Sequence, residues 1–134
     1  METDSIISAI NEIRKKADQA LESKDAVAFT AMFDDALTYT PAEGLILNKR
    51  DYTIDLKKYF SSVKEINTSY YRIKSSFDDE VFTEKIARKS VVLKPKLLVL
   101  SKKETTQTEE IYHWKNIRGE WKVIAVEVTL EEKY

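Results

Sequence analysis

The first part of the chain alternates between apolar and charged positions with the period of a helix. The apolar stripe consists of Ile6, Ile10, Ile13, Ala17 and Leu21. Residues three and four apart share one helix face, so this spacing predicts an amphipathic helix capped by Asp4 or Ser5. The charged residues around the stripe are expected to face solvent: Glu12, Arg14, Lys15, Lys16 and Asp18.

A second, short helix and a strand are predicted next. Asp25 can cap the helix, which is expected to end at Asp34-Asp35. Its inner side carries Phe29, Met32 and Phe33. A strand then covers Ala36–Thr40 and stops at Pro41, because proline cannot donate a hydrogen bond to a ladder.

A third helix is expected after Asn48, with Asp51 at the position that answers a cap. The apolar stripe of this helix is Tyr52, Leu56, Tyr59, Phe60 and Val63. Before it, Glu43-Gly44 is predicted to turn, and residues 45–47 are a candidate short edge strand.

The second half of the chain changes to the alternating pattern of strands. Strands are predicted over 68–77 and 81–93, with a turn at 78–80 between them. Pro95 is expected to bulge or end the second of these strands, and 97–100 is a candidate continuation. Residues 101–104 are expected to turn the chain into a final hairpin.

That final hairpin covers 109–129, with Arg118-Gly119 as its loop. A two-residue loop predicts three pairs: Trp114 with Val123, Tyr112 with Ala125 and Glu110 with Glu127. One face of each strand then forms the inner face: Glu110, Tyr112, Trp114 and Asn116 with Trp121, Val123, Ala125 and Glu127. A three-residue loop would shift this register by one residue.

The second strand of the hairpin is apolar on both faces. Ile124, Val126 and Val128 are predicted to point outward, where they need cover. A homodimer through the outer sheet face is the simplest cover, and the alternative is a solvated outer face.

Helices come first and an antiparallel sheet follows, which predicts the α+β class. The expected architecture is a curved antiparallel sheet wrapped around three N-terminal helices, as a cone with an internal pocket. Residues 1–134 are expected to form one domain, because the sequence has no internal repeats and no linker.

Composition excludes several classes of protein. The net charge of −1 argues against a nucleic-acid binder, which should carry a basic excess. With no cysteine and one histidine, neither a disulfide framework nor a metal site is expected, and the two glycines form no phosphate-binding loop. No cofactor is expected. The chain has no apolar leader and no run long enough to cross a membrane, so we expect a cytoplasmic protein.

Three features together carry a family resemblance. They are a helix pair before Phe33–Pro41, a helix capped by Asn48, and the tail Tyr112-His113-Trp114 followed by Gly119-Glu120-Trp121. Over about Ile6–Thr129 the chain resembles the nuclear transport factor 2-like superfamily of cystatin-like cones, near its SnoaL-like and steroid-isomerase-like members. The resemblance implies a deep pocket and often a dimer. Isomerases, dehydratases, cyclases and binding domains share this fold, so fold alone does not fix function.

The steroid-isomerase branch can be compared by position. The resemblance places the general base at Thr40, a tyrosine donor near Ala17 and a protonated acid near Tyr112. Base and acid are absent, which argues against isomerase activity. The dehydratase branch uses histidine, and His113 is predicted to face outward. The cyclase branch, which places an acid in the pocket wall, is the least excluded.

The candidate catalytic residues are Glu127, Glu110 and Tyr112. Two adjacent carboxylates would not both ionise readily, so one could act as an acid; alternatively, both lie in water or pair with lysine or arginine. The candidate ligand-binding residues are Phe33, Tyr39, Leu56, Tyr59, Tyr112, Trp114 and Glu127.

The favoured hypothesis is a non-catalytic, dimeric domain whose pocket binds a small, largely apolar molecule. A cofactor-free lyase, isomerase or cyclase is the first alternative, and it requires a carboxylate near a tyrosine hydroxyl inside the cone. A protein-interaction module is the second, and it requires a filled cone with an apolar outer patch.

Overall fold

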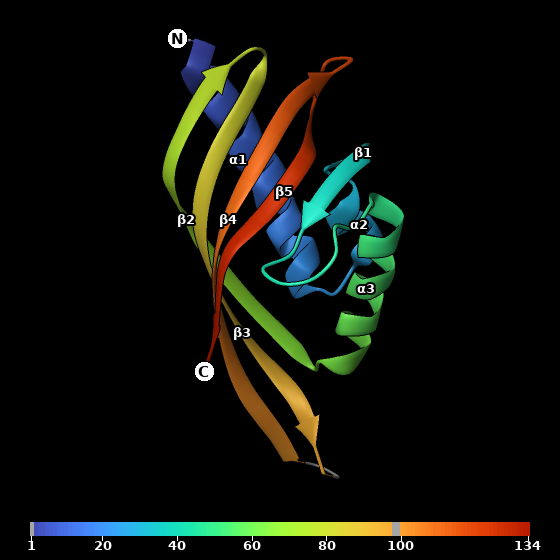
Figure 1. The fold of residues 1–134 in the computed structure, drawn as a ribbon. Coiled ribbons are helices and arrows are strands. Elements are labelled where there is room, and N and C mark those ends of the chain that lie inside the picture. Colours follow the sequence, from blue (N-terminus) through green and yellow to red (C-terminus); the bar gives the residue numbers. More distant parts are fainter. Residues whose placement is uncertain (1, 98–99) are drawn as a thin grey trace.

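The computed structural model describes residues 2–97 and 100–134, which form three helices and five strands. The elements are α1 (Glu2–Glu22), α2 (Ala26–Thr30), β1 (Phe33–Thr40), α3 (Lys49–Ser62), β2 (Glu65–Asp78), β3 (Val81–Lys96), β4 (Leu100–Ile117) and β5 (Glu120–Lys133). The helices cover one face of a strongly twisted sheet (Figure 1). The predicted α+β cone is confirmed.

Capping explains where the short helices begin. The side chains of Asp25 and Asn48 accept hydrogen bonds from backbone N–H groups of the first turns of α2 and α3, as predicted. Two predicted bounds were wrong. The first helix already includes Glu2, ahead of its expected caps, and Phe33 begins β1, so Asp34-Asp35 lies within a strand.

The sheet order is β1-β5-β4-β3-β2, and neighbouring strands are antiparallel from β2 to β5. β1 pairs with β5 in parallel, which corrects the prediction of an all-antiparallel sheet. β1 and β2 lie at opposite edges of the sheet, and α3 connects them. From β2 to β5 each strand then pairs antiparallel with the one before it, which brings β5 beside β1. The expected edge strand at 45–47 is only one bridge, between Leu47 and Tyr39.

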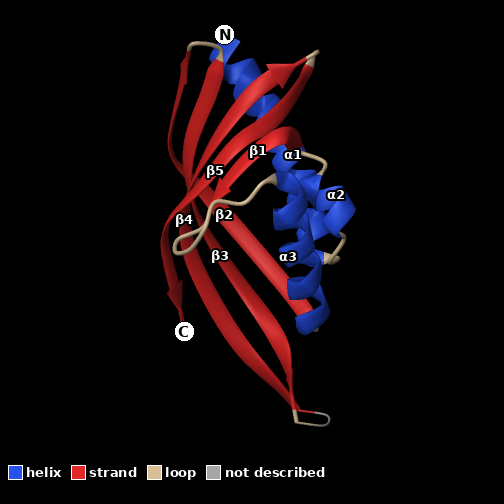
Figure 2. Ribbon diagram, turned by 45° about the vertical axis from the view of Figure 1, so that its right-hand side comes forward, coloured by secondary structure: helices blue, strands red, loops and turns tan. Residues whose placement is uncertain are grey.

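β3 and β4 extend beyond the rest of the sheet as a two-stranded hairpin (Figure 2). Pro95 pairs with Ser101 inside this ladder, so the predicted strand end at Pro95 and the predicted turn at 101–104 were wrong. The pairing of β2 stops at Glu65 opposite Leu93. Past that point β3 is an edge strand. Proline is tolerated there, because no strand on the open side needs a hydrogen bond from its missing N–H. Of the candidate continuation at 97–100, Leu97 lies in the turn, Leu100 begins β4, and the middle residues lie outside the described ones.

The β4–β5 hairpin turns at Arg118-Gly119 and pairs Trp114 with Val123, as predicted. Irregularities then shift the register, so Tyr112 pairs with Val126 and Glu110 with Val128. The other two predicted pairs were therefore wrong. A bulge inserts one residue and reverses which face each later side chain occupies.

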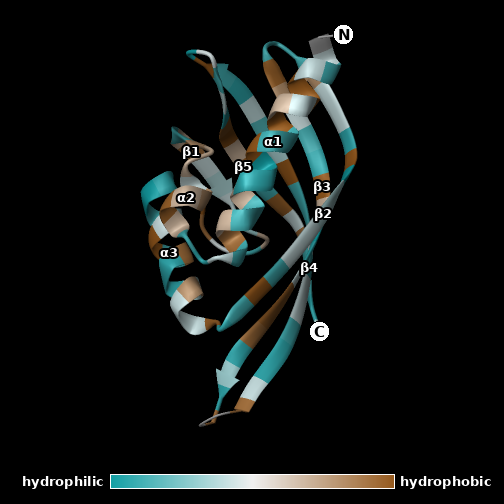
Figure 3. Cartoon of the chain, turned by 180° about the vertical axis from the view of Figure 1, so that it is seen from behind, coloured by the Kyte–Doolittle hydropathy of each residue, from teal (hydrophilic) through white to brown (hydrophobic). Residues whose placement is uncertain are grey.

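The reversal moves two apolar side chains inward. Val126 is 1% exposed and Val128 is 8% exposed, although both were predicted to face outward. Val126 joins the core cluster between the helices and the inner sheet face, and Val128 is buried on the same face. Hydrophobic positions recur along the helices and the strands (Figure 3). Among the described residues, no helix has both the length and the apolar character that crossing a membrane requires.

Candidate functional site

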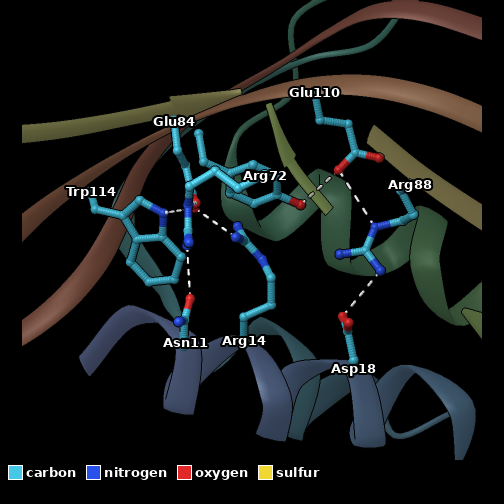
Figure 4. Close-up of polar contacts among 9 residues, drawn as sticks. Asn11, Arg14, Asp18, Arg72, Glu84, Arg88, Glu110 and Trp114 are labelled. Atoms are coloured by element: carbon cyan, nitrogen blue, oxygen red, sulfur yellow. Dashed lines mark hydrogen bonds and ion pairs between the residues drawn. The ribbon is translucent and has the colours of Figure 1, made fainter. Parts of the chain in front are cut away.

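A network of charged side chains lies between α1 and the inner sheet face (Figure 4). Arg14 and Asp18 reach from α1 toward β2, β3 and β4, although both were predicted to face solvent. Arg14 is only 1% exposed. It lies four residues after Ile10 and three before Ala17, so the same spacing that defines the apolar stripe places it on the buried face.

Glu84 on β3 is the centre of this network. Its carboxylate accepts hydrogen bonds from Trp114 Nε1 at 2.6 Å and from Arg72 Nε at 2.9 Å. Arg14 NH1 lies 2.7 Å from the same carboxylate. Arg72 also donates to Asn11 Oδ1 at 2.8 Å, which ties β2 to α1. Two arginines and an indole N–H thus compensate for the burial of one carboxylate.

The Arg14 guanidinium lies among three aromatic rings. Its central carbon is 4.5 Å from the ring centre of Tyr112, 5.0 Å from that of Tyr70 and 5.5 Å from that of Trp114. Its contact with Glu84 is electrostatic, because none of its N–H groups is aligned for a hydrogen bond to the described residues. Ring faces attract a desolvated cation, so the cage stabilises a charge that would otherwise be costly to bury.

Arg88 connects a second group of carboxylates. It donates to Asp18 Oδ1 at 3.1 Å and lies 3.8 Å from Glu110 Oε1. Glu110 also accepts hydrogen bonds from the Tyr112 hydroxyl at 2.9 Å and from Thr108 at 2.5 Å. A buried carboxylate and a tyrosine hydroxyl therefore meet inside the cone, as the enzyme hypothesis requires.

Burial sets the direction of the pKa values in this region. It raises the pKa of Asp18 above its ordinary value, although the Arg88 guanidinium partly opposes the rise. Burial and then the Glu110 charge raise the pKa of the Tyr112 hydroxyl. Burial, followed by the Tyr39 hydroxyl and the Glu110 charge, does the same for Tyr52. The phenols thus remain protonated donors at neutral pH.

The sequence-predicted ligand residues separate into different environments. Four are buried in the core: Phe33, Leu56, Tyr112 and Trp114. Tyr39 is half-buried and packs on Tyr52, with ring centres 4.2 Å apart. Tyr59 is 38% exposed, which corrects its expected place inside the cone. Roles in ligand binding remain predictions for all of them.

Glu127 lies on the outer sheet face, which corrects its predicted place beside Glu110. The register shift between His113 and Trp114 places Val128 opposite Glu110 and leaves Glu127 beside Ile111. The proposed pair of adjacent carboxylates is therefore not formed. His113 is on the outer face, as predicted, within hydrogen-bond distance of Thr83.

A groove of about 420 Å³ lies on the helix side of the sheet, between α1, α2 and the tip of the β4–β5 hairpin. Its apolar lining is Ala9, Ile13, Ala17, Ala28, Ala31, Met32 and Trp121. Four of these residues are alanines, whose side chains are too short to fill the groove beside the Trp121 indole. Lys122 Nζ donates to Ala31 O at 2.8 Å, and Val123 N donates to Met32 O at 2.8 Å. These bonds fix the hairpin against α2 at the groove.

Sequence reasoning missed most of the network and the groove. Glu84 and Arg88 lie two residues from Ile86 on β3, so they share one strand face with it and with Phe82. Phe82 and Ile86 are buried, so strand parity could have placed Glu84 and Arg88 inside. The groove depends on three elements distant in sequence, and no local pattern marks it. In residues 2–97 and 100–134, no three histidine, cysteine or acidic side chains are grouped to hold a metal ion.

Comparisons with known proteins establish the fold. No protein-family model and no curated protein matches the sequence. A conserved protein from Planctomyces limnophilus has a similar structure, with a TM-score of 0.84 and 12% identity over 100% of each chain. A scytalone dehydratase-like protein from Novosphingobium aromaticivorans has a TM-score of 0.83 and 13% identity over 100% of this chain and 92% of its own.

A protein of the nuclear transport factor 2-like superfamily from Salmonella enterica is similar over 94% of this chain and 91% of its own. Its TM-score is 0.81 and its identity is 9%. At such low identity these likenesses describe how the chain folds. They do not carry over a substrate or a reaction.

Proposed function

We propose that this chain, which has the nuclear transport factor 2-like fold, is a homodimeric and non-catalytic domain that binds a small, largely apolar molecule. The groove between α1, α2 and the β4–β5 hairpin carries the proposal. Its volume of about 420 Å³ is in the range of small-molecule sites, and apolar side chains form most of its lining.

The chemistry of the interior supports binding rather than catalysis. Glu84 accepts from Arg72 and Trp114, and Glu110 accepts from Thr108 and Tyr112. Asp18 accepts from Arg88. A general base must reach the proton that it takes from the substrate, and these carboxylates are instead held inside the protein by its own donors.

Anilinonaphthalene sulfonate is a suitable first probe, because its fluorescence rises in apolar sites. We expect saturable binding of one probe molecule per chain. Ala28→Phe should abolish it, because the exposed Ala28 can become a ring that fills the groove without entering the core. Ala42→Phe, on the exposed β1–α3 loop, is the matched control and should bind as the wild type does. Equal binding to both variants would exclude the groove.

The outer sheet face supports the dimer through its rows of paired residues. One row crosses the strands as Lys74, Lys85, Ile111 and Glu127, and another as Tyr71, Ala87, Glu109 and Leu130. A two-fold axis along the strands reverses each row. It places Lys74 of one copy against Glu127 of the other, and Tyr71 against Leu130. An isologous interface must be self-complementary in this way.

A cofactor-free lyase, isomerase or cyclase is the second candidate. The 2.9 Å hydrogen bond from Tyr112 to Glu110 favours it, because a base and an oxyanion donor would need this proximity. A panel of cyclic ketones in heavy water tests it by mass spectrometry. Catalysed deuterium exchange that Glu110→Gln removes would support an enzyme, and exchange at the background rate would exclude this chemistry for the panel.

A further inference from the structure

The β3–β4 arm, defined as residues 93–97 and 100–104, projects beyond the helices and the other strands (Figures 1 and 2). Its two strands pair from Leu93–Lys103 to Lys96–Leu100. The pairing of β2 with β3 ends at Leu93, so no third strand accompanies the arm. The neighbouring body holds only its base, where Lys64 donates to Leu93 O and to Ser101 Oγ.

The tip of the arm exposes two leucines. Leu97 is 79% exposed and Leu100 is 57% exposed. Leu100 N donates to Leu97 O across the turn, so the two residues lie together at the end of the described part of the hairpin. Single exposed apolar residues are common on protein surfaces. A pair at a protruding tip is less common, because it offers apolar surface to any partner that approaches.

Lysines surround these leucines on both strands. Lys96, Lys102 and Lys103 are exposed, and none forms an ion pair within the described part of the chain. Lys94 is bound to Glu104, at 3.1 Å. The arm is therefore basic, although the whole chain has a net charge of −1. Figure 3 shows apolar positions at the tip with hydrophilic ones behind them.

We infer that the β3–β4 arm docks on the surface of a lipid bilayer that contains anionic lipids. The leucines enter the boundary between headgroups and acyl chains, and the lysines remain at the level of the anionic headgroups. The order of the residues fits this occupant, because the apolar part is the most distant from the body and the cations lie behind it. Such docking needs no membrane-spanning segment, and it does not depend on the proposed ligand groove.

Other occupants fit less well. Two arms packed tip to tip would bring their lysines together, which like-charge repulsion opposes. A nucleic acid would engage the lysines but would leave both leucines in water. An anionic bilayer satisfies both kinds of side chain at once.

Co-sedimentation with lipid vesicles tests the inference. Phosphatidylcholine vesicles are compared with vesicles in which part of the lipid is phosphatidylserine, at low and at high salt. We expect binding only to the phosphatidylserine vesicles, with less binding at high salt. Leu97→Asp with Leu100→Asp should weaken it about tenfold or more, and so should Lys102→Glu with Lys103→Glu.

Two matched variants control for surface changes elsewhere. Leu45→Asp with Ile46→Asp alters apolar residues that are 85% and 64% exposed on the β1–α3 loop. Lys57→Glu with Lys58→Glu makes the same charge change on the exposed surface of α3. Both should bind vesicles as the wild type does, and circular dichroism should show that all variants are folded.

Three results would overturn the inference. They are failure of the wild type to sediment with either vesicle, equal loss in arm and control variants, and retained binding after both arm changes. In one such result the wild type does not bind vesicles, and Leu97→Asp with Leu100→Asp lowers the mass of the particle in solution. The arm would then dock on a second copy of the chain and not on a bilayer.

Discussion

At the scale of single residues, Glu84 sets the charge balance inside the cone. It is 1% exposed, and it faces Arg14 and Arg72. Glu84→Gln keeps the volume but leaves a buried guanidinium without its counter-charge. We expect a loss of about 3–5 kcal/mol in the free energy of unfolding. Urea denaturation at neutral pH measures it.

Glu12→Gln is the matched control, because Glu12 is exposed on α1. Its effect should stay within about 0.5 kcal/mol. A loss below about 1 kcal/mol for Glu84→Gln would mean that the ring cage alone stabilises Arg14.

Asp18 gives the fold a specific pH dependence. Burial raises its pKa above the ordinary value of 3.8, so the folded chain holds this proton more tightly than the unfolded chain does. The contribution of Asp18 to stability must therefore fall as pH rises from about 4 through the folded pKa. Asp18→Asn removes the titration and keeps a polar side chain near Arg88.

The test compares free energies of unfolding for the wild type and Asp18→Asn across this pH window. The advantage of the wild type should shrink with rising pH and then level off. A difference that stays flat, or that grows with pH, would show that the Arg88 ion pair outweighs burial.

Single residues also show where sequence reasoning fails. Charged residues between the apolar stripe positions of α1 are predicted to face solvent, and for Lys15 and Lys16 this prediction is confirmed. Arg14 is different because Glu84 and three rings lie opposite it across the cone. Its burial depends on partners from β2, β3 and β4, and no helical pattern contains them.

At the scale of elements, the Arg118-Gly119 turn sets the β4–β5 register as far as the pair of Trp114 with Val123. Both residues have positive φ, 54° and 90°, as a tight hairpin turn requires. Gly119→Ala should cost about 1–2 kcal/mol, because an alanine Cβ would meet no atom within 4 Å and only backbone strain remains. Arg118→Asn should act in the opposite direction, because asparagine tolerates this conformation better than arginine.

Thermal unfolding of both variants checks the prediction. The glycine change should lower the Tm and the asparagine change should raise it. Shifts in the same direction would mean that side-chain contacts dominate at this turn.

Elements also mark the limit of register prediction. The turn signal was sufficient to pair Trp114 with Val123. It was insufficient from His113 onward, because a bulge has no strong sequence mark and changes the face of the residues that follow it. Val126 and Val128 are as apolar as outward-facing dimer residues would be, and the same character suits the buried positions that they occupy.

At the scale of the whole molecule, the order of elements predicted the cone. The caps located the starts of α2 and α3, and the change of period located the sheet after α3. Strand parity could have placed Glu84 and Arg88 inside. The groove and the pairing of these side chains with α1 could not be predicted, because both form where α1 meets strands more than fifty residues away. Residue pairs that distant are specified by packing and not by local periodicity.

The row pairing proposed for the dimer leads to a charge-exchange experiment. Lys74→Glu would place two acidic residues together in the dimer, and Glu127→Lys would place two basic residues together. Each variant alone should dimerise about tenfold more weakly than the wild type. An equimolar mixture should recover dimers, because each interface then contains one restored pair and one reversed pair of opposite charges. Sedimentation velocity measures the wild type, the two variants and their mixture. A monomeric wild type, or a mixture no tighter than its components, would contradict this pairing of the outer faces.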